Sequence, residues 1–307
     1  MKTALFAYRT VGYECAKYLT EDGDETTFII PAEDKGTDGT YKSTKKMLVE
    51  NNIPFFQPKN LRGWNKLRIH LESIDPDIAF SCYYPNIIPM NILSLFHLGG
   101  LNIHGGILPN YRGTFSGVWS IINDEKESGV TLHFMEEKVD LGDIVEIRKC
   151  TIQNDDTGKS LYERISIISI ALFKKYYKKI KNREPLERIL QDASEGKYYS
   201  RKLPHGGLID WGWDDRKIYN FCRACNYPPY KGAVSKIAGR DYEILDVKQT
   251  YESSNMHPGT IVKTSKNGIT VSTNGNDIFI NCLKFDGNVI AMKDFINNLP
   301  FTGNKFE

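Results

Sequence analysis

Two polar side chains at the end of a short apolar segment give the clearest chemical signal in the chain. They are Asn102 and His104, and Gly105 and Gly106 follow directly. Alternation along a strand places Asn102 and His104 on one face, and glycines let a ligand approach the backbone closely. A histidine can relay the proton of an amine near neutral pH, and an amide N–H can stabilise an oxyanion. The pair therefore suits acyl transfer to an amine.

A carboxylate that orients the imidazole ring and stabilises its charged form would complete this arrangement. Asp140, in a loop predicted over residues 136–143, is the candidate. The pattern alone does not bring Asp140 close to His104. A histidine at a strand end can also act only as a structural hydrogen-bonding group, and the residues by themselves leave that alternative open.

The first two thirds of the chain predict a doubly wound α/β sheet, because short apolar runs alternate with amphipathic stretches. A continuous apolar run such as residues 78–83 is typical of a parallel strand covered on both faces. His104 then lies at the carboxyl end of its strand, where such sheets bind ligands. The predicted strands cover residues 3–8, 26–30, 55–56, 78–83 and 101–103, and the predicted helices cover residues 11–19, 43–50, 64–73 and 86–96.

A long helix is predicted over residues 161–180, from apolar positions three or four apart. Its capping box is expected at Ser160 and Glu163, with Thr157 as a competing start. After Arg201 the chain becomes rich in glycine, with a predicted helix over 215–224 and short strands beyond it. We therefore predict two domains, an α/β catalytic domain over residues 1–200 and a small β-barrel domain over residues 201–307.

Composition narrows the classes of function. The 307 residues carry 40 basic and 38 acidic side chains, and a formal charge of +2 does not predict nucleic-acid binding. No apolar run is long enough for a membrane helix. The six scattered cysteines are typical of a reduced, cytoplasmic protein. Cys222 and Cys225 form a CxxC without a second pair, so they favour packing over a zinc site, and no metal is expected.

Several motifs together resemble one known family. Asn102-Ile-His104, Leu108-Pro-Asn-Tyr-Arg-Gly113 and Val139-Asp-Leu-Gly142 are similar to the folate-dependent formyltransferases. The likeness extends over the whole chain and is greatest to the branch that modifies nucleotide sugars. That branch includes the enzymes for UDP-4-amino-4-deoxy-arabinose and for dTDP-linked amino sugars.

The resemblance implies a Rossmann-like formyltransferase domain followed by an OB-like β-barrel. It implies N10-formyltetrahydrofolate as donor, without a metal, and a UDP- or dTDP-linked amino sugar as acceptor. A 4-amino group is expected, in surface polysaccharide (lipopolysaccharide or O-antigen) synthesis, and a homodimer is left open. The catalytic residues would be Asn102, His104 and Asp140. Folate would lie near Asn86, Ile87, Ile88, Glu136, Glu137, Lys138 and Val139, and the nucleotide sugar near Arg9, Tyr111, Arg112 and Arg201.

Two positions depart from the family pattern. The family loop often reads His-Gly-Ser or His-Pro-Ser, whereas this chain has Gly106 in place of the serine. After Gly113 the arabinose enzyme carries an arginine and then Ala-Pro, whereas this chain has Thr114, Phe115 and Ser116. A cation is therefore missing, and Arg9 is a candidate to replace its charge.

Two other functions fit the same pattern. A methionyl-tRNA formyltransferase is expected to have a longer basic loop after the second strand, and residues 31–42 are short and mixed in charge. A non-catalytic protein that binds folate or a nucleotide sugar would not need all three groups of the proposed catalytic triad.

Overall fold

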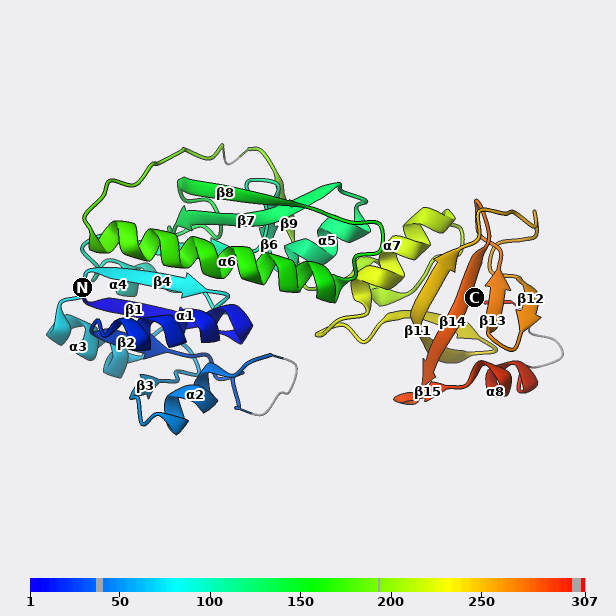
Figure 1. Ribbon diagram of the computed structural model, residues 1–307, viewed down its shortest axis with the longest axis horizontal. Helices are drawn as coiled ribbons and strands as arrows, with labels where there is room; N and C mark the ends of the chain where they lie inside the picture. Colours follow the sequence, from blue (N-terminus) through cyan, green and yellow to red (C-terminus); the bar gives the residue numbers. More distant parts are fainter. Residues whose placement is uncertain (37–40, 193, 300–304, 307) are drawn as a thin grey trace. The chain divides into compact units, whose positions relative to one another are not determined.

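The computed structural model describes residues 1–36, 41–192, 194–299 and 305–306 (Figure 1). The chain forms two compact units, and each is built from more than one segment. Unit 1 comprises Met1–Ser116, Ser128–Cys150 and Glu163–Tyr199, and unit 2 comprises Gly117–Glu127, Thr151–Tyr162 and Ser200–Glu307.

Unit 1 is organised around a seven-stranded sheet with the order β3-β2-β1-β4-β5-β7-β8 (Figure 1). The first five strands of that order run parallel to one another, whereas β7 runs antiparallel to β5. Every residue of β1 and β4 is buried, as expected for strands covered on both faces. The strands are β1 (Thr3–Ala7), β2 (Thr26–Ile29), β3 (Phe55–Phe56), β4 (Ile78–Cys82), β5 (Gly100–His104), β7 (Glu127–Phe134) and β8 (Ile144–Thr151).

Helices cover this sheet through close packing. A Cβ on Gly12 of α1 would lie 2.7 Å from the backbone of Ala7, so only glycine lets the helix approach β1 this closely. Phe173 of α6 packs edge-on against Phe80 of β4, with 5.0 Å between ring centroids. The helices up to α6 are α1 (Arg9–Asp22), α2 (Thr44–Glu50), α3 (Asn65–Ile74), α4 (Met90–Leu93), α5 (Ser116–Ile122) and α6 (Gly158–Lys181). All of α5 after Ser116 and the first turn of α6 belong to unit 2. A small parallel pair joins β6 (Tyr111–Gly113) to β9 (Lys197–Tyr199).

Unit 2 contains a six-stranded antiparallel sheet and one amphipathic helix, α7 (Asp215–Cys225). The Asp214 side chain caps α7 by accepting a hydrogen bond from the Lys217 N–H. The remaining elements are the 3₁₀ helix η1 (Pro204–Gly207), β10 (Ala233–Ile237), β11 (Arg240–Gln249), β12 (Ile261–Ser265), β13 (Gly268–Val271), β14 (Ile278–Phe285), β15 (Asn288–Ile290) and α8 (Met292–Asn297). The predicted fold class, a Rossmann-like unit with a mostly antiparallel β unit, is confirmed.

The CxxC pair belongs to the core of unit 2. Cys222 and Cys225 are free, buried and packed among apolar side chains of α7 and the sheet. Burial raises the pKa of Cys225 to about 12 and that of Cys222 well above its ordinary value. Thiolates are therefore disfavoured at both positions, as expected for packing residues.

One local prediction was wrong, and an alternative left open for α6 is decided. The helix predicted over residues 86–96 is only the single turn of α4, Met90–Leu93, because Pro89 holds the preceding residues out of the helical conformation. Of the two starts predicted for α6, the competing one at Thr157 is the one that forms. The Ser160 N–H donates to Thr157 Oγ1, and the Thr157 N–H donates to Ser160 Oγ.

In the part of the chain that the structure describes, no helix is long and apolar enough to cross a membrane. Within the same residues, no three histidine, cysteine or acidic side chains are grouped so that they could hold a metal ion.

Candidate active site

Asn102 and His104 face two polar residues of the neighbouring strand. In the antiparallel register of β5 and β7, Asn102 lies opposite His133 and His104 lies opposite Thr131. Directly opposed residues share a face of the sheet, so four polar side chains gather there. Thr131 Oγ1 donates to the Gly106 carbonyl at 2.7 Å and accepts from the Leu108 N–H at 3.1 Å. Thr131 thereby fixes the turn that follows His104.

The His104 ring is buried, with 6% of its surface exposed, and each ring nitrogen faces oxygen atoms. Nδ1 lies 3.6 Å from Asp140 Oδ2. Nε2 lies 2.5 Å from the Tyr111 carbonyl and 3.3 Å from Ser116 Oγ. This arrangement fixes the ring plane. Nε2 is the ring nitrogen that does not face the carboxylate.

Asp140 is held in place by its own backbone conformation and by its neighbours. It adopts a left-handed φ of +57°, and its Oδ2 accepts a hydrogen bond from the Gly113 N–H at 2.8 Å. Gln191 Nε2 donates to the carbonyls of Asp140, at 3.1 Å, and Gly142, at 2.6 Å. A Cβ on Gly142 would lie 2.0 Å from the Phe134 carbonyl. These contacts explain the Asp-x-Gly spacing, because this loop path excludes any side chain at residue 142.

The charge state of Asp140 follows from opposing effects. Burial alone would raise the pKa of this carboxyl group, but His104, His133 and the Gly113 N–H outweigh burial and hold the pKa well below its usual range. The carboxylate is therefore ionised at neutral pH and provides a fixed negative charge beside His104.

His133 is part of this cluster, although the sequence analysis gave it no role. Its Nδ1 lies 2.8 Å from the Phe134 carbonyl, and its Nε2 lies 3.0 Å from Asn102 Nδ2. Nε2 also lies 3.5 Å from Asp140 Oδ1. His133 thus contacts both Asn102 and Asp140. The contact with Nδ2 restricts the orientation of the Asn102 amide.

The comparisons with known proteins identify the family. The formyl transferase family model matches residues 20–173, and the model of the formyl transferase C-terminal domain matches residues 203–300. The chain belongs to the formyl transferase family. The family predicted from the motifs is confirmed.

A curated relative agrees with this assignment. The bifunctional polymyxin resistance protein ArnA of Wigglesworthia glossinidia brevipalpis is 34% identical over 287 residues, which cover 92% of this chain and 41% of ArnA. This chain therefore spans less than half the length of that relative.

Two solved structures share the fold. An N-formyltransferase from Helicobacter canadensis, solved with folinic acid and dTDP-3-aminofucose, has a TM-score of 0.74 at 22% identity and covers 92% of this chain and 99% of its own. WlaRD, a sugar 3N-formyl transferase solved with dTDP and 5-N-formyl-THF, has a TM-score of 0.71 at 22% identity and covers 92% of this chain and 97% of its own.

The residues that the family resemblance assigned to folate lie in two loops of unit 1. Asn86, Ile87 and Ile88 follow β4, at the same sheet edge as His104, because β4 and β5 are parallel. Ile88 is buried, whereas Ile87 is 59% exposed. The other four residues, Glu136 to Val139, are exposed in the loop that ends at Asp140. Both loops therefore present side chains to solvent and contain no regular structure.

Arg9 occupies an unusual position at the carboxyl end of β1. It is the first residue of α1 and has a left-handed φ of +56°. Its guanidinium carbon lies 4.4 Å from the ring centroid of Tyr41 and 5.0 Å from that of Phe115. Its Nε is buried without a hydrogen-bond partner. Within the described residues, this half-buried cation is held by aromatic rings and not by a carboxylate.

The other three predicted substrate contacts differ from Arg9. Tyr111 stacks on Tyr199, with 5.0 Å between ring centroids, and uses its carbonyl to contact His104. Arg112 Nη2 donates to the carbonyls of Glu195 and Gly196, so this guanidinium already binds a neighbouring loop. Arg201 has an exposed side chain and belongs to unit 2. The structure thus places Arg9, Tyr111 and Arg112 in unit 1, where Tyr111 alone of the three has a contact with His104, and it places Arg201 in unit 2.

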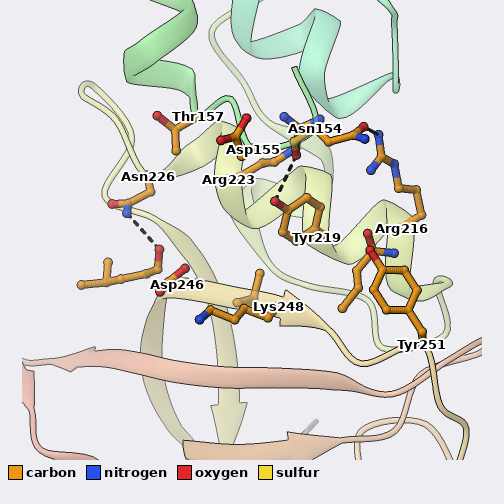
Figure 2. Close-up of a pocket in the computed structure, with 13 residues that line it drawn as sticks. Asn154, Asp155, Thr157, Arg216, Tyr219, Arg223, Asn226, Asp246, Lys248 and Tyr251 are labelled. Carbon is orange, nitrogen blue, oxygen red and sulfur yellow. Dashed lines mark hydrogen bonds between the residues drawn. The ribbon is translucent and has the colours of Figure 1, made fainter. Parts of the chain in front are cut away.

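Unit 2 contains a hollow of about 410 Å³ between the segment before α6, helix α7 and strand β11 (Figure 2). Its arginines already have protein partners. Arg216 donates twice to Asp124 Oδ1, at 2.9 and 2.7 Å. Arg223, which is 6% exposed, donates to the carbonyls of Gln153 and Asp156 at 3.2 and 2.5 Å. These cations join segments of unit 2, and we assign no ligand to the hollow.

Proposed function

We propose that this chain transfers the formyl group of N10-formyltetrahydrofolate to the amine of a UDP- or dTDP-linked amino sugar. The sugar nitrogen attacks the formyl carbon, and the bond between that carbon and N10 breaks. The proton lost by the amine is delivered to N10. The products are the N-formylated sugar nucleotide and tetrahydrofolate, so the reaction needs no oxidant or reductant.

One observation carries the proposal, namely the cluster that half-buried Asn102 forms with buried His104 and Asp140 in a chain of the formyl transferase family. An amide N–H of Asn102 stabilises the oxyanion that develops on the formyl oxygen. His104 accepts the amine proton through Nε2 and returns it to the leaving nitrogen. Asp140 remains ionised and stabilises the imidazolium that forms in between.

Folate as donor and a nucleotide sugar as acceptor have separate support. The two solved neighbours were crystallised with folinic acid or 5-N-formyl-THF and with dTDP or a dTDP-sugar. In this chain Arg9 provides a cation without an ion-pair partner among the described residues, at the sheet edge where ligands bind. We assign Arg9 to the phosphates of the acceptor. Tyr111, Arg112 and Arg201 remain predicted contacts, with Arg112 restricted by its two carbonyl bonds.

The finer features of the function rest on the family resemblance. We propose a 4-amino acceptor used in surface polysaccharide synthesis, and binding of the folate between residues 86–88 and the loop of residues 136–139. A cytoplasmic location is supported by six free cysteines. The homodimer stays a prediction. Light scattering during size-exclusion chromatography would measure the molar mass in solution and so test it.

A mass-spectrometric assay tests the function directly. The purified protein is incubated with N10-formyltetrahydrofolate and, in parallel, with UDP- and dTDP-linked 3-amino and 4-amino sugars and with initiator methionyl-tRNA. We expect one sugar nucleotide to gain one CO unit in mass, with an equivalent of tetrahydrofolate formed. Formylation of the tRNA alone would contradict the proposal. Folate binding without any product would indicate a binding protein instead.

A further inference from the structure

The turn after His104 has no side chain at the position nearest the ring. A Cβ built on Gly106 would lie 2.8 Å from His104 Nε2 and 2.7 Å from Ser116 Cβ. Both distances are shorter than ordinary contacts, so the space that a side chain of residue 106 would take is already filled. It is filled by Ser116, the first residue of α5, which is 3% exposed.

Ser116 has its hydroxyl group beside the same nitrogen. Ser116 Oγ lies 3.3 Å from His104 Nε2 and donates to the Tyr111 carbonyl at 3.0 Å. The Tyr111 carbonyl is also the oxygen that lies 2.5 Å from Nε2. The Tyr111 carbonyl, the Ser116 hydroxyl and His104 Nε2 are therefore in mutual contact within unit 1.

We infer that Ser116 is a positioning residue for His104. Its side chain takes the space that a side chain at residue 106 would need, so residues 106 and 116 are a coupled pair. The inference rests on the proposed role of His104 in moving the amine proton.

The hydroxyl can serve both states of the ring. When Nε2 carries a proton, it donates to the Tyr111 carbonyl, and Ser116 donates to the same oxygen. When Nε2 loses that proton, its lone pair faces the carbonyl oxygen at 2.5 Å, where two acceptors repel each other. Rotation of the Ser116 hydroxyl then directs its proton to Nε2, because a serine O–H turns freely about its C–O bond. Without Ser116, the neutral ring lacks this partner.

The other titratable groups near the ring come from the elements packed around it. Asp140, in the loop after β7, lies 3.6 Å from His104 Nδ1, and the ring centroid of His133 on β7 lies 6.4 Å away. Both groups are retained in the variants below, so any change in proton uptake reports on residues 106 and 116.

The test compares Ser116→Ala with Ser120→Ala, which removes a second buried serine hydroxyl from the same helix. For Ser116→Ala we expect kcat/KM to fall roughly tenfold, the value of about one hydrogen bond. The acid limb of the pH profile of kcat/KM should move to higher pH by up to about one unit, because the neutral ring loses a donor. For Ser120→Ala we expect the wild-type pH profile.

Exchange of the pair provides a second test. Gly106→Ser alone should lose most activity and lower the melting temperature, because the new Cβ meets Ser116. The double variant Gly106→Ser/Ser116→Gly moves the hydroxyl from residue 116 to residue 106. Its kcat/KM should be at least tenfold higher than that of Gly106→Ser alone. A double variant no better than Gly106→Ser would overturn the inference. A Ser116→Ala enzyme with reduced activity but an unchanged pH profile would also overturn it.

A readout that does not depend on turnover separates this inference from the proposed function. Nitrogen-15 NMR of the His104 ring reports which ring nitrogen carries the proton. We expect Ser116→Ala to change the Nε2 shift of the neutral ring, and Ser120→Ala to leave it as in wild type. If the wild-type chain formylates no acceptor while Ser116→Ala changes this shift, the proposed function fails and the link between Ser116 and His104 stands. Unchanged ring shifts would refute the link itself.

Discussion

Both units bury charged side chains, but the two surround their charges differently. In unit 2 the Arg223 guanidinium is bound by Asn220 Oδ1 at 2.9 Å and by two backbone carbonyls. In unit 1 the Asp140 carboxylate has one hydrogen bond, from Gly113, and lies 3.5 and 3.6 Å from two histidine rings. Those longer distances give electrostatic attraction without a well-formed hydrogen bond.

The difference separates a structural charge from a functional one. Arg223 donates from Nε and Nη1 to groups of α7 and of residues 153–156, so its charge is used to hold segments of unit 2 together. Asp140 lies beyond ordinary hydrogen-bond distance of both histidine rings, and it also has a strained left-handed backbone. Strain and incomplete pairing are typical of functional sites. Substitutions in the two clusters should therefore affect different properties.

The largest effect is expected from His104→Ala. Removing the group that moves the amine proton should lower kcat roughly 10²–10⁴-fold, while the melting temperature and folate binding stay close to wild type. Steady-state kinetics, calorimetry and fluorescence titration with folinic acid measure the three properties. Normal turnover in this variant would remove His104 from the mechanism.

Arg223→Met should show the reverse pattern. Two backbone carbonyls, of which that of Asp156 is buried, and the Asn220 side chain lose their donor, so the free energy of unfolding should fall by on the order of 3 kcal/mol. Turnover per folded molecule should remain near wild type. Urea unfolding and active-site titration measure the two quantities. The free energy of unfolding of Arg223→Lys, which keeps the charge but not the planar fork of donors, should lie between those of wild type and Arg223→Met. A stable but inactive Arg223→Met variant would break the contrast between the two clusters.

Asp140→Asn should change how stability depends on pH. The folded-state pKa of Asp140 is lowered, so its ionised form stabilises the fold above the value of an unfolded carboxyl group, about 3.9. That stabilisation is lost as the pH falls further, towards the folded-state pKa. Wild type should therefore lose stability relative to Asp140→Asn as the pH is lowered below about 4. Parallel unfolding curves between neutral and acidic pH would show this, and a constant difference would argue against the lowered pKa.

Arg9→Met should have the smallest effect and should change binding alone. Loss of one phosphate contact should raise KM for the sugar nucleotide about tenfold, with kcat and the KM for folate unchanged. Added salt should weaken binding of the acceptor less in this variant than in wild type. Arg62→Met, which removes an exposed arginine of the same unit, is the matched control. Equal effects of the two substitutions would exclude Arg9 as a specific phosphate contact.

The parts of the site that could be predicted are those set by local pattern. A run of apolar residues and two glycines place Asn102 and His104 at the end of β5, and the structure has them there. Asp140 was predicted in a loop over residues 136–143, and the structure has it in that loop. Local pattern was insufficient where proline intervened, since Pro89 limits the predicted helix over residues 86–96 to one turn.

The missing parts depend on contacts between distant segments. His133 faces Asn102 only because β7 pairs antiparallel with β5 in one particular register, and sequence alternation does not specify a partner strand. Gln191 reaches the Asp140 loop from a segment about fifty residues away in the sequence. Its side-chain amide donates to a backbone carbonyl, which every residue type has, so the sequence shows no motif for this contact. Ser116 appeared only as a departure from the family pattern, and its place beside the ring required coordinates.

The anchoring of the Asp140 loop by Gln191 has a consequence for the order in which the site is completed on the ribosome. Asn102, His104, Gly113, His133 and Asp140 all emerge before the amide that fastens their loop. A nascent chain that ends within α6 contains every proposed reacting group, but the path of residues 140–142 is not yet tied down. The path of the loop that carries the carboxylate is therefore tied down only after Gln191 has been synthesised.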